Sequence, residues 1–140
     1  MIEKTLILLK PDAVRRNLIG EIISRFERKG LKIVAMKFMK LDEEKAKEHY
    51  KVHLGKDFYE PLIKFITSGP IVAMIIQGEQ AIEISRIIVG KTSPHDATPG
   101  SIRGDFASIT RENLVHASDS PESSEREMAI FFDSSDIISW

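Results

Sequence analysis

The sequence contains no cysteine and no long apolar run. Without cysteine the chain cannot form disulfides, thiolate metal sites or a cysteine nucleophile, and this absence is compatible with a reducing compartment. The N-terminal run Leu6–Leu9 stops at Lys10 and Pro11, so it is too short for the core of a signal peptide or for a membrane span. We therefore expect a cytoplasmic protein without a membrane partner.

The chain also lacks an excess of charge of either sign, with 20 Lys and Arg against 21 Asp and Glu. A chain this balanced has no general basic field for nucleic acid or anionic lipid, so we expect that no nucleic acid is required as a partner. Any anion must be held by a local cluster of side chains. At 140 residues the chain is long enough to bury a core of its own, and residues 1–140 are expected to form one domain.

Apolar patterning predicts the order of strands and helices. Continuous or alternating apolar residues predict strands at 5–9, 31–41, 71–76 and 129–132. Helical spacing and capping residues predict helices at 19–30, from Asp42 onward, at 58–66, at 79–89 and from Ser120 to about Met128. This order is typical of an α+β fold, a ferredoxin-like α/β sandwich with a central four-stranded antiparallel sheet.

Residues 91–106 show no period and contain two prolines and two glycines. A loop of this length in a compact domain is usually functional. Gly90-Lys91-Thr92 resembles the end of a P-loop, but Ser85 stands where that motif needs glycine, and a helix rather than a strand precedes it. We therefore reject a P-loop and keep the Thr92 hydroxyl and Arg86 as candidates for contact with a phosphate.

The polar stretch 113–120 is the strongest candidate for a reactive site. Its histidine, His116, follows two apolar residues and precedes Ser118-Asp119-Ser120, so a strand or buried turn would hold one ring nitrogen toward a pocket. This arrangement suits a nucleophile or a general base. The alternative is a structural histidine at a strand end, with the small polar residues capping the next helix.

Other candidates carry weaker signals. His49 and His53 stand four residues apart, but Tyr50 lies where a metalloprotease needs glutamate and we expect no third ligand nearby, so we predict two solvent-facing histidines and no metal site on the protein. The cations Lys10, Arg86 and Arg103 stand at the ends of elements or in the loop, where side chains can converge; solvated surface charge is the alternative reading. Phe58 is either core or an exposed platform.

Five segments together resemble one known family. They are TLILLKPDAV (5–14), GEIISRFERKG (20–30), SGPIVAM (68–74), TSPHDATPGSIRGDF (92–106) and NLVHASDS (113–120). With these segments the chain resembles the nucleoside diphosphate kinases. The resemblance implies transfer of the γ-phosphate of a nucleoside triphosphate, mainly ATP, to a nucleoside diphosphate. The transfer would be ping-pong through a phosphohistidine at His116, with Mg²⁺ bound mainly through the nucleotide phosphates, and would maintain cellular NTP and dNTP pools.

The resemblance also implies roles for individual residues. Those that match the family's nucleotide site are Lys10, Tyr50, Phe58, Leu62, Arg86, Thr92, Arg103 and Asn113, while Glu127, with Ser118 in support, would hold His116. Family members form tetramers or hexamers, so a homo-oligomer is expected. Ala117 stands where the family commonly has glycine; it either bears a strained positive φ, at roughly 1 kcal/mol, or is not strained. A ferredoxin-like nucleotide- or RNA-binding module without the chemistry remains the alternative function.

Overall fold

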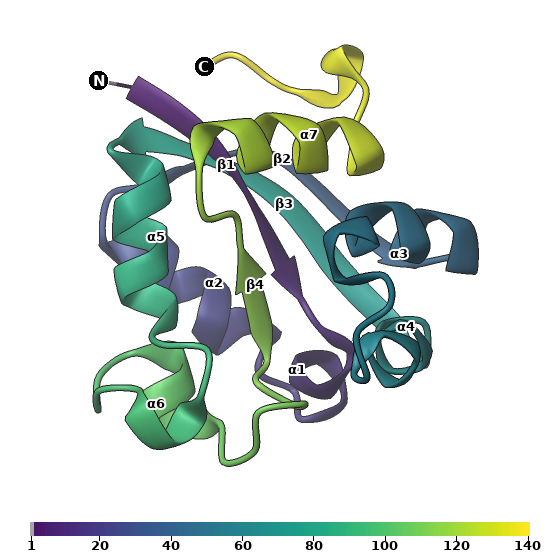
Figure 1. The fold of residues 1–140 in the computed structure, drawn as a ribbon. Helices are drawn as coiled ribbons and strands as arrows, with labels where there is room; N and C mark the ends of the chain where they lie inside the picture. The colour runs from purple at the N-terminus through teal and green to yellow at the C-terminus, as the bar shows by residue number, and fades with distance from the viewer. Residues whose placement is uncertain (1) are drawn as a thin grey trace.

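A four-stranded antiparallel sheet forms the centre of the computed structural model, which describes residues 2–140 (Figure 1). The strands are β1 (Ile2–Leu9), β2 (Lys32–Lys40), β3 (Pro70–Glu79) and β4 (Val115–Ala117), in the spatial order β2-β3-β1-β4. Every neighbouring pair is antiparallel. The sheet and its helices confirm the predicted α+β class.

Helices cover both faces of the sheet. On one face lie α2 (Ile19–Arg28), α5 (Ala81–Val89) and α6 (Ile102–Phe106); on the other lie α3 (Glu43–His49), α4 (Tyr59–Ile66) and α7 (Pro121–Phe131) (Figure 1). The short helix α1 (Pro11–Arg15) begins where β1 ends, and 3₁₀ turns occupy Lys51–His53, Pro94–Asp96 and Ser134–Asp136.

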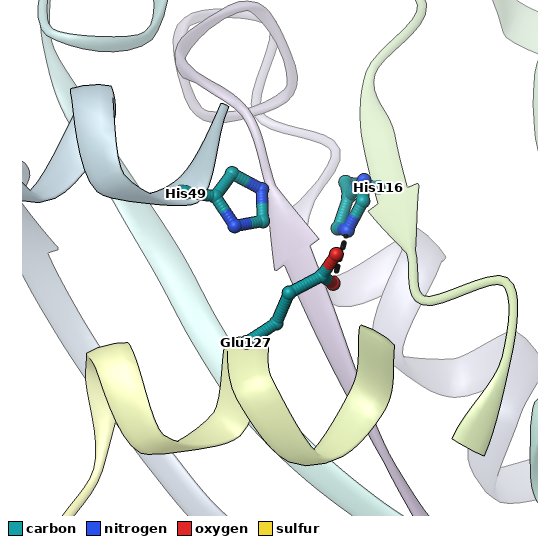
Figure 2. A group of neighbouring side chains, drawn as sticks. All are labelled: His49, His116 and Glu127. Atoms are coloured by element: carbon teal, nitrogen blue, oxygen red, sulfur yellow. Dashed lines mark hydrogen bonds and ion pairs between the residues drawn. The ribbon is translucent and has the colours of Figure 1, made fainter. Parts of the chain in front are cut away.

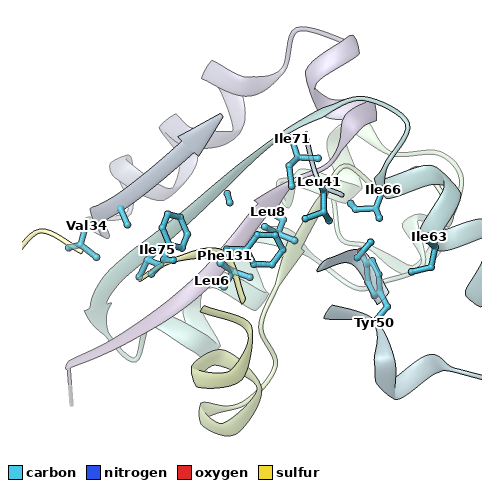
Figure 3. Close-up of a cluster of buried hydrophobic side chains, with 14 of the residues drawn as sticks. Leu6, Leu8, Val34, Leu41, Tyr50, Ile63, Ile66, Ile71, Ile75 and Phe131 are labelled. Carbon is cyan, nitrogen blue, oxygen red and sulfur yellow. The ribbon is translucent and has the colours of Figure 1, made fainter. Parts of the chain in front are cut away.

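Two apolar clusters result because successive side chains of a strand point to opposite faces. Leu6 and Leu8 of β1 belong to the cluster under α3, α4 and α7, where Phe131 is almost fully buried (Figure 3). Ile7 and Leu9 belong to the cluster under α2, α5 and α6. β1 is therefore buried on both sides, as its continuous apolar run predicts.

Predicted helix boundaries are largely confirmed. Gly30 and Gly90 follow α2 and α5, each with a φ of +93°, a conformation that glycine adopts without steric cost. The side chain of Asp42 accepts the Lys45 N–H at the start of α3, and Ser120 accepts the Ser123 N–H at the start of α7.

The predicted strand at 129–132 is wrong. Residues up to Phe131 continue α7, and the fourth strand is instead β4 at the histidine stretch. The inner face of α7 carries Ser124, Glu127 and Phe131, spaced three and four apart, so two of its three buried residues are polar. An apolar pattern therefore appears only at the helix end, where it resembles a short strand.

The loop predicted at 91–106 is partly helical. It contains a 3₁₀ turn and α6, whose N-cap Ser101 accepts the Gly104 N–H, and α1 was also not predicted. Helices of five residues are too short to show a 3.6-residue period.

The C-terminal tail lies along the edge strand β2. The Ile138 N–H donates to the Val34 carbonyl at 2.8 Å, and Trp140 Nε1 donates to the Ile33 carbonyl at 3.0 Å. These bonds occupy backbone acceptors that an edge strand otherwise leaves open. Within residues 2–140, no helix combines the length and apolar character needed to cross a membrane.

Candidate active site

His116 lies in the middle of β4 and faces the layer formed by α3 and α7 (Figure 2). It pairs with Leu8 of β1, so both side chains point to the same face of the sheet. From α7, Glu127 approaches the ring: its Oε1 lies 2.7 Å from His116 Nε2. The Ser118 hydroxyl donates to the same oxygen at 2.7 Å.

These bonds determine which ring nitrogen is free. An ionised carboxylate can only accept hydrogen bonds, so Nε2 carries the hydrogen and the lone pair lies on Nδ1. Burial lowers the pKa of His116, and the bond to Glu127 offsets part of that effect. Burial alone would raise the pKa of Glu127, but the bonds from His116 and Ser118 help to bring it below the usual value. At neutral pH the pair is therefore a neutral imidazole beside a carboxylate.

Lys10 and Asn113 connect the end of β1 to the stretch before His116. Lys10 Nζ donates to Asn113 Oδ1 at 2.8 Å, and Asn113 Nδ2 donates to the Thr92 carbonyl at 3.1 Å. Burial, followed by the charge of Arg103, lowers the Lys10 pKa to about 8. The structure thus brings Lys10, Asn113 and the loop residue Thr92 together, although Thr92 contributes its carbonyl to this network.

Two guanidinium groups reach the backbone around His116. Arg103, on α6, is buried and donates to the carbonyls of Gly90, Asn113 and Val115. Arg86, on α5, donates to the Ala117 carbonyl at 3.1 Å. Three of the five N–H groups of Arg103 are used, which leaves two for a ligand. Burial and the neighbouring Arg86 lower the Arg103 pKa to about 10.

The three cations Lys10, Arg86 and Arg103 share an electrostatic property. Among residues 2–140, none of them forms an ion pair with a carboxylate within 4.0 Å. Lys10 and Arg103 are buried, whereas Arg86 is exposed, and buried positive charge is costly unless an anion compensates it. The site is therefore electrostatically suited to a bound phosphate.

The remaining predicted site residues are Phe58, Leu62 and Tyr50. Phe58 precedes α4 and is 44% exposed, and its ring centroid lies 5.2 Å from that of His53, which is partly buried and not, as predicted, fully solvent-facing. Leu62 follows one turn later and is half-buried. Tyr50 is buried, its hydroxyl has no hydrogen-bond partner, and burial raises its pKa. Phe58 and Leu62 thus offer an accessible apolar surface, whereas Tyr50 packs behind it.

His49 is a residue of the site that the sequence analysis misplaced. It was predicted to face solvent, yet it is 2% exposed, and its ring centroid lies 4.7 Å from that of His116 in an edge-on contact (Figure 2). It also contacts the rings of Tyr50 and Phe131. The spacing does contain the signal, because His49 follows the buried Ala46 by three residues on α3.

The surroundings of His49 correct a second expectation, that no third ligand is near. Donor atoms of His49, His116 and Glu127 lie within 4.8 Å of one another, a set that could hold a metal. However, His116 Nε2 and Glu127 are already bonded to each other at 2.7 Å, and the Arg126 guanidinium lies 3.6 Å from the same carboxylate. The absence of a metal site on the protein stays a prediction.

His49 makes a pH effect on stability testable. Both of its ring nitrogens lack hydrogen-bond partners, and burial lowers its pKa well below the usual value. Below pH 6.5 the unfolded chain therefore binds a proton at His49 that the folded chain does not. As the pH is lowered, this residue decreases the free energy of unfolding by up to about 1.4 kcal/mol per pH unit. The fall stops below the folded-state pKa.

We expect chemical denaturation of the native protein between pH 7 and pH 5 to show this decline. The variant His49→Phe, which keeps a ring of similar size, should decline less steeply, and the remainder reflects His116 and His53, whose pKa values are also lowered by burial. Equal slopes for the two proteins would contradict the placement of a neutral His49 in the core.

Ala117 is not strained. The non-glycine residues with positive φ are Asn17, Gln80 and Leu114, among residues 2–140, and the value at Leu114 is +74°. The positive φ expected for Ala117, which stands where the family commonly has glycine, is found instead at Leu114, three residues earlier. For a residue with a Cβ such a conformation costs about 1–3 kcal/mol.

A surface hollow of about 810 Å³ lies along α5 and residues 98–101 rather than over His116. Of the predicted site residues it includes only Arg86, and its lining combines isoleucines such as Ile87 with Lys29 and Lys91. Volume alone would point away from His116. The site is identified instead by its hydrogen bonds and charges.

A neutral histidine held by a carboxylate, beside cations without carboxylate partners, is suited to enzymes that act on phosphate groups. The fold and the site thus define a ferredoxin-like phosphotransferase. The family model described as nucleoside diphosphate kinase matches residues 3–137. The chain belongs to the nucleoside diphosphate kinase family, and it is an enzyme of that family.

Individual relatives agree with this assignment. The nucleoside diphosphate kinase of Kosmotoga olearia is 57% identical and covers 99% of this chain and 94% of its own; that of Methanocaldococcus jannaschii is 56% identical, covering 98% of each. Among solved structures, a halophilic nucleoside diphosphate kinase from Halobacterium salinarum in complex with CDP is 46% identical. It has a TM-score of 0.97 and covers 100% of this chain and 93% of its own.

Proposed function

We propose that this chain transfers the γ-phosphate of a nucleoside triphosphate, mainly ATP, to a nucleoside diphosphate in two steps through His116. The observation that carries the proposal is the 2.7 Å bond between His116 Nε2 and Glu127, which leaves the lone pair of Nδ1 free to attack. In the first step the Nδ1–P bond forms and the bond from phosphorus to the bridging oxygen breaks, which releases a nucleoside diphosphate. In the second step a terminal oxygen of another diphosphate attacks phosphorus, and the N–P bond breaks.

Glu127 supports both steps electrostatically. Phosphorylation at Nδ1 gives the ring a positive charge while Nε2 keeps its hydrogen, and the carboxylate at 2.7 Å stabilises that charge. Ser118 holds the carboxylate oxygen in place. No proton has to leave the ring during the transfer.

The cations compensate the charge of the transferred group. A phosphoryl group in transfer spreads negative charge over its equatorial oxygens, and the reaction depends mainly on positioning and charge compensation. Arg86 and Arg103 donate to carbonyls on either side of His116, and Lys10 lies beside Asn113. In this proposal their remaining N–H groups hold the phosphates, and the Thr92 hydroxyl adds a further donor.

Magnesium fits this site through the nucleotide. Mg²⁺ prefers oxygen ligands in octahedral geometry, whereas the side chains around His116 supply mainly nitrogen donors and a carboxylate that is already bonded. When bound, the ion neutralises phosphate charge. The protein's own contribution is to orient the phosphates that carry the ion.

We assign the base of the nucleotide to Phe58 and Leu62, and its ribose to Lys10 and Asn113. Phe58 offers an exposed ring, with Leu62 one turn along the helix, and a base stacks on such a surface without edge recognition. In this proposal Lys10 and Asn113 bond ribose hydroxyls, and Tyr50 supports the pocket from behind. The complex of the H. salinarum relative with CDP supports nucleotide binding here.

Replacement of Phe58 by Ala tests the platform. We expect the KM for the nucleoside diphosphate to rise about tenfold, because stacking on an aromatic ring contributes roughly 1–3 kcal/mol per base, while kcat stays near the native value. Steady-state kinetics with two different diphosphates measures both constants. Phe58→Trp keeps the ring surface and should retain the native KM; an unchanged KM in Phe58→Ala would contradict the stacking role.

The remaining family properties complete the proposal. We infer a homo-oligomer, a tetramer or hexamer, and a role in maintaining NTP and dNTP pools; sedimentation analysis tests the former. The cytoplasmic location and the single domain over 1–140 stay predictions from the sequence. The RNA-binding alternative is not favoured, because the family comparisons describe kinases.

The test of the proposed function is transfer itself. Purified protein with ATP, Mg²⁺ and GDP or dTDP should form the corresponding triphosphate, with parallel double-reciprocal lines that indicate a ping-pong mechanism. Intersecting lines would indicate direct transfer between bound nucleotides and would contradict the role of His116 as carrier.

A further inference from the structure

The backbone immediately before His116 makes a strained γ-turn. Leu114 has a φ of +74°, and the Val115 N–H donates to the Asn113 carbonyl two residues back, at 2.9 Å. A γ-turn whose central residue has positive φ is rare in proteins. It persists only where the surroundings hold it, and such strain concentrates at functional sites.

The peptide groups of Leu114 are held from the start of α1. The Leu114 N–H donates to Asp12 Oδ2 at 3.0 Å, and the Leu114 carbonyl accepts from the Lys10 N–H at 2.8 Å. Asp12 and Leu114 are both buried, 2% and 0% exposed, and they stand 102 residues apart in sequence. Of these two bonds only the one to Asp12 depends on a side chain.

A second group holds the flanks of the turn. Arg103 Nε donates to the Asn113 carbonyl at 3.2 Å and its Nη2 to the Val115 carbonyl at 2.6 Å. The turn thus carries Asn113, bonded to Lys10 Nζ, on one side and leads into His116 on the other. A change in the turn would move both residues together.

We propose that Asp12 is a positioning residue for the transfer reaction: its carboxylate oxygen holds the Leu114 γ-turn and thereby sets the orientation of His116. Among residues 2–140 Asp12 forms no ion pair within 4.0 Å; its carboxylate also interacts with backbone N–H groups at the start of α1 and with the charge of Lys10, and the bond from the Leu114 N–H is what links it to the γ-turn. The inference rests on the proposed phosphorylation of His116.

Three substitutions of Asp12 separate the position of its oxygen from its charge. Asp12→Asn keeps an oxygen of the right reach but loses the charge, Asp12→Glu keeps the charge but displaces the oxygen, and Asp12→Leu keeps the size and removes the acceptor. Since a misplacement of about 1 Å can cost up to about 10²-fold in rate, we expect Glu and Leu to slow His116 phosphorylation at saturating ATP and Mg²⁺ by at least about tenfold. Asn should stay within about threefold of native.

Two further measurements exclude a merely structural effect. Hydrogen exchange followed by NMR should show faster exchange of the Leu114 and Val115 amides in Asp12→Leu, with the β1 and β3 amides unchanged. Asp136→Leu serves as the matched control, because Asp136 also accepts a backbone N–H, from Asp133, but belongs to the C-terminal tail, where it pairs with Lys37 and has no bond to the stretch around His116 among residues 2–140. Its phosphorylation rate should equal the native rate.

Each outcome of these measurements either supports or overturns the role of Asp12. Slow Glu and Leu variants beside a near-native Asn variant support the proposal. A native rate in Asp12→Leu overturns it, and so does an Asn variant as slow as Leu, because charge and not the held turn would then matter. If Asp12→Leu does not fold, the comparison of Asn with Glu decides. A native protein that is not phosphorylated at His116 contradicts the proposed function instead, and amide exchange at Leu114 still tests the turn.

Discussion

His116→Ala should fold and lose nucleoside diphosphate kinase activity by at least about 10⁴-fold. The substitution removes the proposed nucleophile, the Nδ1 lone pair of His116, and removal of a nucleophile takes away the whole covalent route rather than one contribution to it. Glu127 keeps its bond from Ser118, so we expect a loss of stability of only about 1–3 kcal/mol. The measurement is the initial rate of triphosphate formation, together with thermal unfolding to show that the variant is folded.

The matched control is His95→Ala. His95 is an exposed histidine in the 3₁₀ turn at Pro94–Asp96 and is not among the predicted site residues, so its loss should leave the rate unchanged. Transfer by the His116 variant at more than a few per cent of the native rate would rule out His116 as the carrier.

Glu127→Gln should slow phosphorylation of His116 by about 10²-fold. The amide oxygen can still accept the hydrogen on Nε2, so the tautomer is preserved, but the negative charge that stabilises the phosphorylated ring is lost. Quench-flow measurement of phosphoenzyme formation isolates this step. ATP affinity should change much less, because Glu127 faces the ring nitrogen opposite to the one that attacks.

Ser118→Ala provides a graded comparison for the same carboxylate. It removes one neutral hydrogen bond to Glu127 and leaves the charge in place, so a slowing of only a few-fold is expected. If Glu127→Gln were no slower than Ser118→Ala, orientation rather than charge would be the function of Glu127.

Much of the fold could be predicted from apolar patterning. β1 and β3 are continuous apolar runs because both faces of the sheet are covered, and α2 ends where Gly30 follows it. The C-terminal end of α7 could not be predicted in this way, because its inner face carries Ser124 and Glu127. Glu127 is buried beside His116, and Ser124 is buried where its hydroxyl donates to the Lys4 carbonyl, so the inner face of the helix shows no apolar period.

The site, like the fold, could be predicted from the sequence only in part. The sequence singles out His116 and the cations Lys10, Arg86 and Arg103, and the structure places those cations around residues 113–117, whereas Phe58 lies at the start of α4; their roles stay predictions. His49 was misplaced because pairs of histidines were considered as ligands rather than as members of a helix face. The bond from Leu114 to Asp12 spans 102 residues, and no local pattern indicates a partner at that distance.

The mass of the intact protein tests the central claim most directly. After brief mixing with ATP and Mg²⁺, the native protein should gain the mass of one phosphoryl group in an acid-labile form, and addition of a nucleoside diphosphate should remove it. His116→Ala should show no gain. A native protein that forms triphosphate product without ever gaining this mass, or that gains it equally in His116→Ala, would contradict transfer through His116.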